Sequence, residues 1–462
     1  MKPAAACAPL LAVRRRLPAH SCLPTSSASS RCCTTASTTS TTPTAEQPPL
    51  VLPKKEKKRK IKFDPMTLPP SPQTFPSYER KDFFRFELLH QSKKEGSRAR
   101  VGRLHTPHGI VNTPGFVAVA TNGALKAVDH DWGNEAGQEL TFCNTYHLLL
   151  QPGPDVIKAC GGLHKFINRD RPIITDSGGF QVFSLAHGSI FDELNMKSRG
   201  NKHKSETSSV LKITEEGCLF RSYRDGRKVL LTPESSVQAQ KAYGSDIIIP
   251  LDELHPYHIE PDALLRCVLR SHRWEARSLN EHLKDVQQQA MYAVIHGGID
   301  PNLRKASCEY LTSLPFDGFA VGGALGKDRE ELVEVLRVTM PHLPVEKPNH
   351  LLGIADEPSI WAGSALGVDT FDSCFPTRIA RHGTLLTKEG PVYIRKQVHK
   401  EDLRPLEEGC DCFTCRRHSR AYLHHLYRAC EPLSATLLSI HNLQYMNGLM
   451  ARIRVKIMND EI

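Results

Sequence analysis

Short apolar runs alternate along the chain with segments that carry apolar residues at helical spacing. The runs are rich in β-branched residues and occupy residues 172–175, 247–251, 292–295, 318–321 and 350–354. Residues 261–283 and 329–338, which lie between runs, have the spacing of amphipathic helices. Strands that alternate with helices predict a parallel sheet in a protein of the α/β class.

Polar and glycine-rich residues follow these runs one after another. They are Asp176-Ser-Gly-Gly, Asp252-Glu, His296-Gly-Gly, Gly322-Gly323, residues 353–356, and Asp369-Thr-Phe-Asp372. In a (β/α)8 barrel the carboxyl ends of all strands meet at one mouth, where several strands supply reacting groups. An open doubly wound sheet concentrates its site at one switch point instead. We therefore predict an irregular TIM (β/α)8 barrel.

Residues 187–232 interrupt the alternation. Asp225-Gly226 separates two segments that each carry apolar residues, which predicts a hairpin inserted into the barrel. Residues 197–208 are polar, and we expect a mobile loop there.

The first 75 residues have a different composition from the rest of the chain. No acidic residue precedes Glu46, three arginines at 14–16 follow a short apolar run, and residues 25–44 are rich in Ser and Thr. This composition is typical of a transit peptide and predicts import into a mitochondrion or plastid; a disordered tail without a targeting role is the alternative. The basic run 54–60 has proline on either side and is interpreted as a solvated linker.

Charge and apolar content narrow the class of protein. The net charge is +10, which fits a polyanionic partner weakly, because part of it lies in the N-terminal segment. No stretch approaches the ~18 uninterrupted apolar residues of a membrane helix, so we expect no membrane partner. The 14 cysteines show no disulfide framework, which indicates a reducing compartment.

Three cysteines within six residues predict a metal site. Cys410, Cys412 and Cys415 place three thiolates within reach of one ion, and zinc takes four tetrahedral nitrogen or sulfur ligands. His441 is our choice for the fourth ligand, with His424 and His425 as competitors and a chance cluster as the alternative. A closed Cys3His shell leaves no open position, so we expect one structural Zn²⁺ ion.

These features divide the chain into three parts. We assign residues 1–75 to a transit peptide and disordered basic linker, 76–400 to the barrel, and 401–462 to a C-terminal zinc-binding subdomain with closing helices.

Several motifs together resemble the tRNA-guanine transglycosylase family. Thr175-Asp-Ser-Gly-Gly-Phe-Gln181 is similar to the family's base-binding strand end, and residues 369–378 are similar to its nucleophile segment. The cysteine cluster, with residues 420–425 and 439–442, resembles its zinc element, and Phe142-Cys-Asn-Thr-Tyr-His147 also fits. The likeness covers residues 84–462. The amino-acid sequences of residues 249–255 and 294–298 are closer to those of a subset of bacterial-type members. Together with the transit-like tail, this suggests an organelle enzyme.

The resemblance implies an exchange of bases in tRNA. Guanine at the wobble position of tRNAs with GUN anticodons is replaced by queuine or by a precursor such as 7-aminomethyl-7-deazaguanine. Asp372 is implied as the nucleophile that attacks the ribose C1′ carbon, and Asp176 as the proton acceptor for the incoming base. Two rival functions are a glycosidase and a non-catalytic tRNA-binding subunit of a heterodimer. Both aspartates and a complete zinc set are present, which argues against the second.

The same resemblance assigns the binding residues. For the base they are Asp176, Ser177, Gly178, Gly179, Phe180, Asp252, His296, Gly323 and Leu352. For the RNA they are Gly353, Ser359, Thr377, Arg378 and Arg381, with solvated surface charge as the alternative for the arginines.

The chain departs from the family pattern at two places. Many members have Gln where this chain has His296, and a bulkier turn where it has residues 322–327. The second departure favours queuine over the smaller precursor. A homodimer and a heterodimer with a related subunit both remain open.

Overall fold

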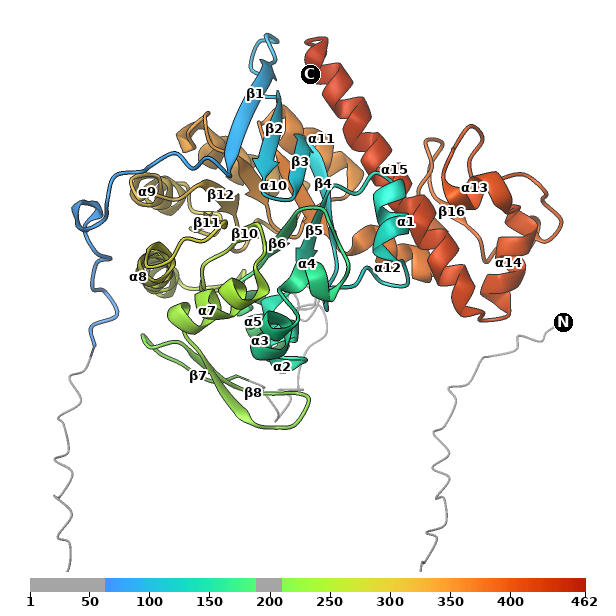
Figure 1. Cartoon of the computed structure of the whole chain (residues 1–462). Coiled ribbons are helices and arrows are strands. Elements are labelled where there is room, and N and C mark those ends of the chain that lie inside the picture. Colours follow the sequence, from blue (N-terminus) through green and yellow to red (C-terminus); the bar gives the residue numbers. More distant parts are fainter. Residues whose placement is uncertain (1–62, 188–209) are drawn as a thin grey trace, which may run out of the picture. The chain divides into compact units, whose positions relative to one another are not determined.

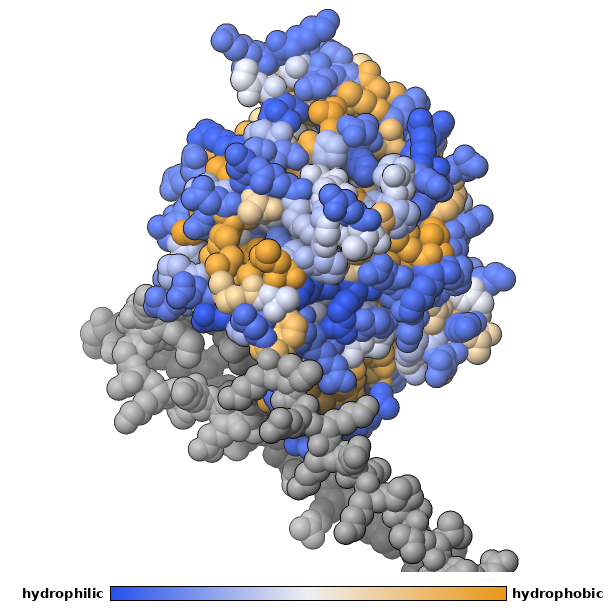
Figure 2. Space-filling view, turned by 90° about the vertical axis from the view of Figure 1, so that its left-hand side faces the viewer, coloured by the Kyte–Doolittle hydropathy of each residue, from blue (hydrophilic) through white to orange (hydrophobic). Residues whose placement is uncertain are grey.

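The computed structural model describes residues 63–187 and 210–462. The transit-like tail and basic run up to residue 62 and the polar segment 197–208 lie outside the described residues. Lys62–Ile462 form one compact unit. Among the described residues no helix combines the length and apolar character needed to cross a membrane. The face turned to the viewer in Figure 2 is largely hydrophilic, with separate hydrophobic patches.

Eight parallel strands close into a barrel, as predicted. In order around the barrel they are β10 (Ile247–Ile248), β11 (Ala290–Ile295), β12 (Gly318–Val321), β13 (Asn349–Leu351), β14 (Thr370–Ser373), β4 (Gly115–Val119), β5 (Leu140–Cys143) and β6 (Ile173–Thr175). Every neighbouring pair is parallel.

Two of the predicted strands are shorter than the apolar runs that suggested them. β10 stops at Ile248, because the side chain of Gln240 bonds both backbone groups of Ile249: its Nε2 donates to the carbonyl at 2.8 Å, and its Oε1 accepts the N–H at 3.1 Å. β13 stops at Leu351, so Leu352 and Gly353 belong to the loop at the mouth.

Helices surround the strands (Figure 1). They are α1 (His130–Glu135), α2 (Thr145–Leu150), α3 (Pro154–Ala159), α4 (Leu163–Phe166), α5 (Gly179–His187), α7 (Pro233–Tyr243), α8 (Pro261–Leu283), α9 (Pro301–Thr312), α10 (Arg329–Thr339), α11 (Glu357–Ala365) and α12 (Phe375–Arg381). Asp300, Asp328 and Asp356 each accept a backbone N–H in the first turn of the helix that follows, which fixes where α9, α10 and α11 begin.

The amino-terminal end of the barrel is covered by a small antiparallel sheet. Its strands are β1 (Arg85–Gln91), β2 (Arg100–Thr106) and β3 (Gly109–Thr113). The Arg100 guanidinium bonds both oxygens of Asp369, at 2.9 and 2.6 Å, and both residues are buried. Asp369 therefore lies before β14, at the end of the barrel opposite Asp372. Its assignment to the polar mouth was wrong, because the strand β14 separates the two ends.

Residues 63–75 contact the barrel, although their composition predicted an unstructured linker. Phe75 is buried, and the Tyr310 hydroxyl donates to the Pro70 carbonyl at 3.0 Å. Farther along, Lys81 reaches the buried Asp317 carboxylate at 2.5 Å, which compensates for the burial of that charge.

The predicted hairpin is part of a three-stranded antiparallel sheet. β7 (Val210–Ile213), β8 (Cys218–Arg221) and β9 (Lys228–Leu231) follow one another, and Asp225-Gly226 lies in the turn between β8 and β9. Cys218 and Phe220 of this sheet share an apolar cluster with Tyr146 of α2 and with Leu251, which follows β10. The sheet is thereby held at the carboxyl end of the barrel.

A C-terminal subdomain packs beside the barrel. Its elements are β15 (Thr384–Leu385), β16 (Val392–Tyr393), α13 (Phe413–Arg417), α14 (Arg420–Arg428) and the first turns of α15 (Pro432–Met458). Its apolar core includes Ala380, Leu385 and Ile394, so residues before 401 contribute to it. The long helix α15 also contacts β2 and β4 and ties the subdomain to the barrel (Figure 1).

Two stacked histidines share one buried aspartate at the amino-terminal end of the barrel. Asp246 accepts from His108 Nδ1 at 2.8 Å and lies 3.1 Å from His164 Nε2. The two imidazole planes stack with centroids 3.5 Å apart and 12° between them, and the ligand atoms of the two histidines and Asp246 lie within 4.8 Å of one another. We interpret the group as a proton-dependent clasp between the β2–β3 turn and the barrel.

This clasp predicts a pH dependence of stability. The hydrogen bond to Asp246 raises the pKa of His108 above its unfolded value. Its contribution to stability is therefore complete below about pH 6.5 and is lost as the pH rises through the folded-state pKa. We expect the wild type to melt at a higher temperature than His108→Gln at pH 6, and the two melting temperatures to converge toward pH 9. A difference in melting temperature between the two proteins that stays the same from pH 6 to pH 9 would refute the interpretation.

Candidate functional site

Carboxylates from three barrel strands meet at the carboxyl-terminal mouth. Asp176 follows β6, Asp252 follows β10, and Asp372 lies on β14. His296 follows β11 and adds an imidazole to the group. The structure therefore brings together, at one end of the barrel, the four residues with reactive side chains that the sequence analysis found at the ends of strands.

Asp372 is held by one oxygen only. Its Oδ1 accepts the backbone N–H of Gly353 at 2.7 Å and lies 3.1 Å from His350 Nε2. His350 is in turn fixed through its Nδ1, which is 2.9 Å from the Thr370 hydroxyl. No described residue donates a hydrogen bond to Oδ2, which leaves that oxygen free to act as a nucleophile toward a bound substrate.

Asp176 accepts four hydrogen bonds. Its Oδ1 accepts from the backbone N–H groups of Thr145 at 2.7 Å and Gly178 at 3.1 Å. Its Oδ2 accepts from the side-chain amides of Asn144 at 2.6 Å and Gln181 at 2.9 Å. Burial raises the pKa of Asp176 to about 6, and these hydrogen bonds oppose the rise. A carboxyl group with a pKa near neutrality is suited to proton transfer.

Asp252 also titrates near neutrality. Burial raises its pKa to about 7, and the neighbouring charge of Asp176 adds to the rise. The Ser177 hydroxyl donates to Asp252 Oδ1 at 3.4 Å, which places the predicted base-binding segment against this carboxylate.

His296 and Glu275 form a buried pair behind Asp252. His296 Nε2 lies 3.4 Å from Asp252 Oδ2 and 3.7 Å from Glu275 Oε1. Burial lowers the pKa of His296 well below its ordinary value, so the imidazole is neutral near pH 7, and burial raises the pKa of Glu275 well above its ordinary value. A neutral imidazole presents one N–H donor and one acceptor.

Three glycines allow the loops at the mouth to pack closely against one another. A Cβ on Gly179 would lie 2.9 Å from the Asp252 carbonyl oxygen, and one on Gly178 would lie 3.1 Å from the Tyr146 nitrogen. Gly323 has φ of 77°, a conformation that favours glycine, and its missing Cβ faces His296 Nδ1 at 3.4 Å. Phe180 is 57% exposed, so its ring is available for stacking. Leu352 is half-buried beside Gly322.

The predicted RNA-binding residues divide by exposure. Arg378 and Arg381 are exposed on α12, and Gly353 is exposed in the loop after β13. The side chains of Ser359 and Thr377 are buried, and Thr377 donates its hydroxyl proton to the Cys374 carbonyl at 3.3 Å. The two arginines are therefore the residues of this group placed to meet a phosphate.

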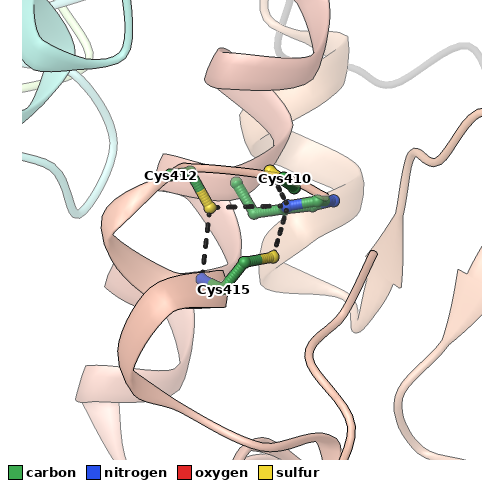
Figure 3. Close-up of side chains that lie close together, drawn as sticks. Cys410, Cys412 and Cys415 are labelled. Atoms are coloured by element: carbon green, nitrogen blue, oxygen red, sulfur yellow. Dashed lines mark hydrogen bonds between the residues drawn. The ribbon is translucent and has the colours of Figure 1, made fainter. Parts of the chain in front are cut away.

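A separate cluster in the subdomain can hold a metal ion. The sulfurs of Cys410, Cys412 and Cys415 lie 3.7, 3.6 and 3.4 Å from His441 Nδ1. Figure 3 shows the three cysteines turned toward this ring nitrogen. His441 Nε2 donates to the Leu386 carbonyl at 2.9 Å, which orients Nδ1 toward the sulfurs. His424 is not part of the cluster, since its Nδ1 bonds the Ile394 carbonyl.

Sequence reasoning missed four residues that support the site. Asn144 and Gln181 bind Asp176, His350 binds Asp372, and Glu275 faces His296. Asn144 and Gln181 lie inside motifs that the sequence analysis quoted. His350 sits inside an apolar run, and Glu275 lies in the middle of α8, where a pattern of polarity gives no signal of a partner.

Known proteins match nearly all of the described chain. The family model for queuine tRNA-ribosyltransferase matches residues 94–462. The queuine tRNA-ribosyltransferase of Protochlamydia amoebophila is 60% identical over 380 residues, which cover 82% of this chain and 97% of the relative. The enzymes of that name from Chlamydia felis and Chlamydia caviae are each 55% identical over 82% of this chain and 99% of their own length. This chain therefore belongs to the queuine tRNA-ribosyltransferase family, the tRNA-guanine transglycosylases.

Proposed function

We propose that this transglycosylase exchanges guanine at the wobble position of tRNAs with GUN anticodons through a covalent bond between Asp372 and the ribose. The observation that carries the proposal is the one-sided anchoring of Asp372, which fixes Oδ1 and leaves Oδ2 without a donor among the described residues. A carboxylate so placed suits attack on an oxocarbenium-like carbon, as in retaining glycosidases.

The reaction divides into two displacements at C1′. Asp372 Oδ2 forms a bond to C1′ as the bond from C1′ to guanine N9 breaks, and N9 takes a proton from the protonated Asp176 as guanine leaves. The incoming base then gives its N9 proton to Asp176 and displaces Asp372 from the same carbon. Asp252 accepts the adjacent N–H groups of the guanine-like edge, and Phe180 stacks on the ring. The target nucleotide has to leave the anticodon stack to enter the mouth, and Arg378 and Arg381 bind the neighbouring phosphates.

We propose zinc as the ion of the cysteine cluster. Zinc at ordinary bond lengths in a tetrahedron separates a sulfur and a nitrogen ligand by about 3.6 Å, which supports this choice beside the separations of 3.4–3.7 Å. Four protein ligands leave no position for a substrate, so Cys410, Cys412, Cys415 and His441 would hold a structural ion. The ion would stabilise the subdomain and take no part in base exchange.

Queuine is the base that we propose for the exchange. The supporting observation is the small turn after β12, where a Cβ on Gly323 would lie 3.4 Å from His296 Nδ1. Gly326 has a different role: a Cβ there would lie 2.6 Å from Glu331 Cβ, so this glycine serves packing on α10. Comparing exchange rates with queuine and with 7-aminomethyl-7-deazaguanine tests the choice. Equal or faster use of the precursor would exclude it.

The activity itself is tested by incorporation of labelled guanine into tRNA. The substrate carries a GUN anticodon, and the matched control is the same tRNA with its wobble guanosine replaced by adenosine. We expect label only in the GUN tRNA. Absence of label with a metal-loaded protein would favour a non-catalytic tRNA-binding subunit that needs a related partner.

The composition of the N-terminal segment supports import into a mitochondrion or plastid as a further part of the proposal.

Use of the base is expected to depend on pH through Asp252. The carboxylate accepts the two N–H groups of the base only when ionised, and its pKa is raised to about 7. We therefore expect kcat/KM for guanine to fall as the pH drops through 7 toward 6, where Asp176 also protonates. Asp252→Asn should remove the part of this dependence near pH 7 together with most of the activity. Glu275→Gln is the matched control, because it makes the same carboxyl-to-amide change at a different, fully buried residue. A flat wild-type profile would contradict the assignment.

A further inference from the structure

Tyr223 stands exposed in the turn between β8 and β9. Its side chain is 55% exposed, although it belongs to a sheet that packs its other aromatic residue, Phe220, completely inside. Phe220 and Cys218 already anchor the hairpin in the apolar cluster around Tyr146. The exposed face of Tyr223 is therefore not needed to hold the hairpin in place.

The Tyr223 ring is nevertheless fixed in orientation. It stacks on the Tyr146 ring with centroids 6.0 Å apart and 27° between the planes. It meets the His147 ring edge-on at 6.0 Å, and its hydroxyl lies 3.3 Å from His147 Nδ1. Tyr146 thus supports one face of the ring, and the Arg224 guanidinium lies over the ring with its carbon 5.9 Å from the centroid.

A short series of contacts connects this ring to the catalytic mouth. Tyr146, which supports Tyr223, follows Thr145, whose backbone N–H donates to Asp176 Oδ1 at 2.7 Å. A Cβ on Gly178 would lie 3.1 Å from the backbone nitrogen of Tyr146. Tyr146 therefore lies between Tyr223 and the segment that contains Asp176.

Positive charge surrounds the ring. Residues 221–228 contain Arg221, Arg224, Arg227 and Lys228 against the single acid Asp225, and all of these side chains are exposed. Burial lowers the pKa of His147, and the charges of Lys126 and Arg224 lower it further. Cations from two separate loops therefore lie within electrostatic range of this histidine.

We propose that this hairpin tip, residues 221–228 together with Lys126, is a second RNA-binding surface of the enzyme. Tyr223 stacks on a base of the anticodon loop that is left without its neighbour when the target nucleotide leaves the stack, and the cations bind the flanking phosphates. This inference rests on the proposed function. It adds a contact on the side of α2, which follows β5, to the contact of α12, which follows β14; only β4 lies between those strands. The RNA is then held at two neighbouring positions on the rim of the mouth.

Substitution of the ring separates stacking from packing. Tyr223→Leu keeps an apolar contact with Tyr146 but removes the aromatic face, and we expect KM for tRNA to rise about tenfold. KM for guanine and the melting temperature should stay unchanged. Tyr223→Phe keeps the ring, so its KM for tRNA should stay within about twofold of wild type. An unchanged KM for tRNA in Tyr223→Leu, or a lower melting temperature with both KM values raised, would overturn the proposal.

Salt dependence tests the cations. The double variant Arg224→Ser, Arg227→Gln should reduce the slope of log Kd for tRNA against log salt by about 0.7–0.9 for each phosphate that the variant no longer neutralises. Arg337→Gln on the outer helix α10 removes an equally exposed charge and should leave the slope unchanged. Direct tRNA binding does not require catalysis. If the wild type binds tRNA but exchanges no guanine, the proposed function fails while the binding comparison still decides the role of the hairpin.

Discussion

Replacement of Asp372 by asparagine is expected to abolish base exchange and the covalent tRNA adduct while leaving the fold intact. Asparagine has the shape of aspartate and can still accept from Gly353 N–H through its amide oxygen, so the link between β14 and the loop after β13 survives. Its amide nitrogen cannot form the bond to C1′. Removal of a nucleophile that works as a unit with its site lowers kcat on the order of 10⁴-fold or more.

The measurement has two readouts. Guanine exchange is followed by label in tRNA, and the adduct is followed as a slow-migrating protein–RNA band under denaturing conditions. Wild type should give both, and Asp372→Asn neither, with tRNA binding retained. His350→Gln is the companion variant. It disturbs the orientation of Asp372 but not its chemistry, so it should slow the exchange without removing the adduct. An adduct of normal yield in Asp372→Asn would assign the nucleophile to another residue.

The barrel is predictable from the sequence because its signals are local. Pro261 and the apolar spacing up to Leu283 define α8 with the bounds that the structure has. The lengths of the strands are not local. β10 ends early because Gln240, seven residues before the strand begins, bonds the backbone of Ile249 in place of a neighbouring strand. A polar side chain that replaces strand pairing has no signature in a hydrophobic pattern.

Asp369 shows a second limit of interpreting patterns. An aspartate three residues before the proposed nucleophile is easily taken as part of the same polar end. In the structure β14 runs between them, and Arg100, 269 residues away in sequence, neutralises Asp369 at the opposite end of the barrel. The partner of a buried charge is set by the tertiary fold, so sequence alone does not reveal it.

In the candidate site, too, some residues could be predicted from the sequence and others could not. Asp176, Asp252 and Asp372 stand at run ends and could be predicted, whereas the groups that tune them come from other elements. Glu275 lies on a buried face of α8 and reaches His296 across the space between helix and strand. Only the closed barrel brings such a pair together. This is why the departure at His296 was visible in the sequence and the buried Glu275 beside it was not.

Removal of the metal ion is expected to destabilise the subdomain and then to weaken tRNA binding. The four residues of the cluster join the loop at 410–415 to the first half of α15, and a bound ion would compensate the charges of three thiolates held this close together. For structural zinc the binding free energy contributes directly to folding, and apparent values in small domains are on the order of 10 kcal/mol. Cys412→Ser should therefore lose bound zinc, measured by elemental analysis, and should become sensitive to limited proteolysis within 400–430. Cys430→Ser is the matched control, because Cys430 is exposed and lies outside the cluster.

Loss of the metal ion should weaken tRNA binding more than it weakens binding of the base. His441 Nε2 bonds the Leu386 carbonyl, and the next residue, Asn442, donates from its side chain to the carbonyl of Pro376 in α12 at 2.9 Å. Release of the metal frees this part of α15 and with it the helix that carries Arg378 and Arg381. The pocket formed by Asp176, Asp252 and His296 stands on other strands and keeps its geometry. KM for tRNA should consequently rise in Cys412→Ser while KM for guanine changes little. Zinc retained at one equivalent with an unchanged melting temperature would contradict the assignment of the ligands, and an equal rise in both KM values would contradict the proposed path through α12.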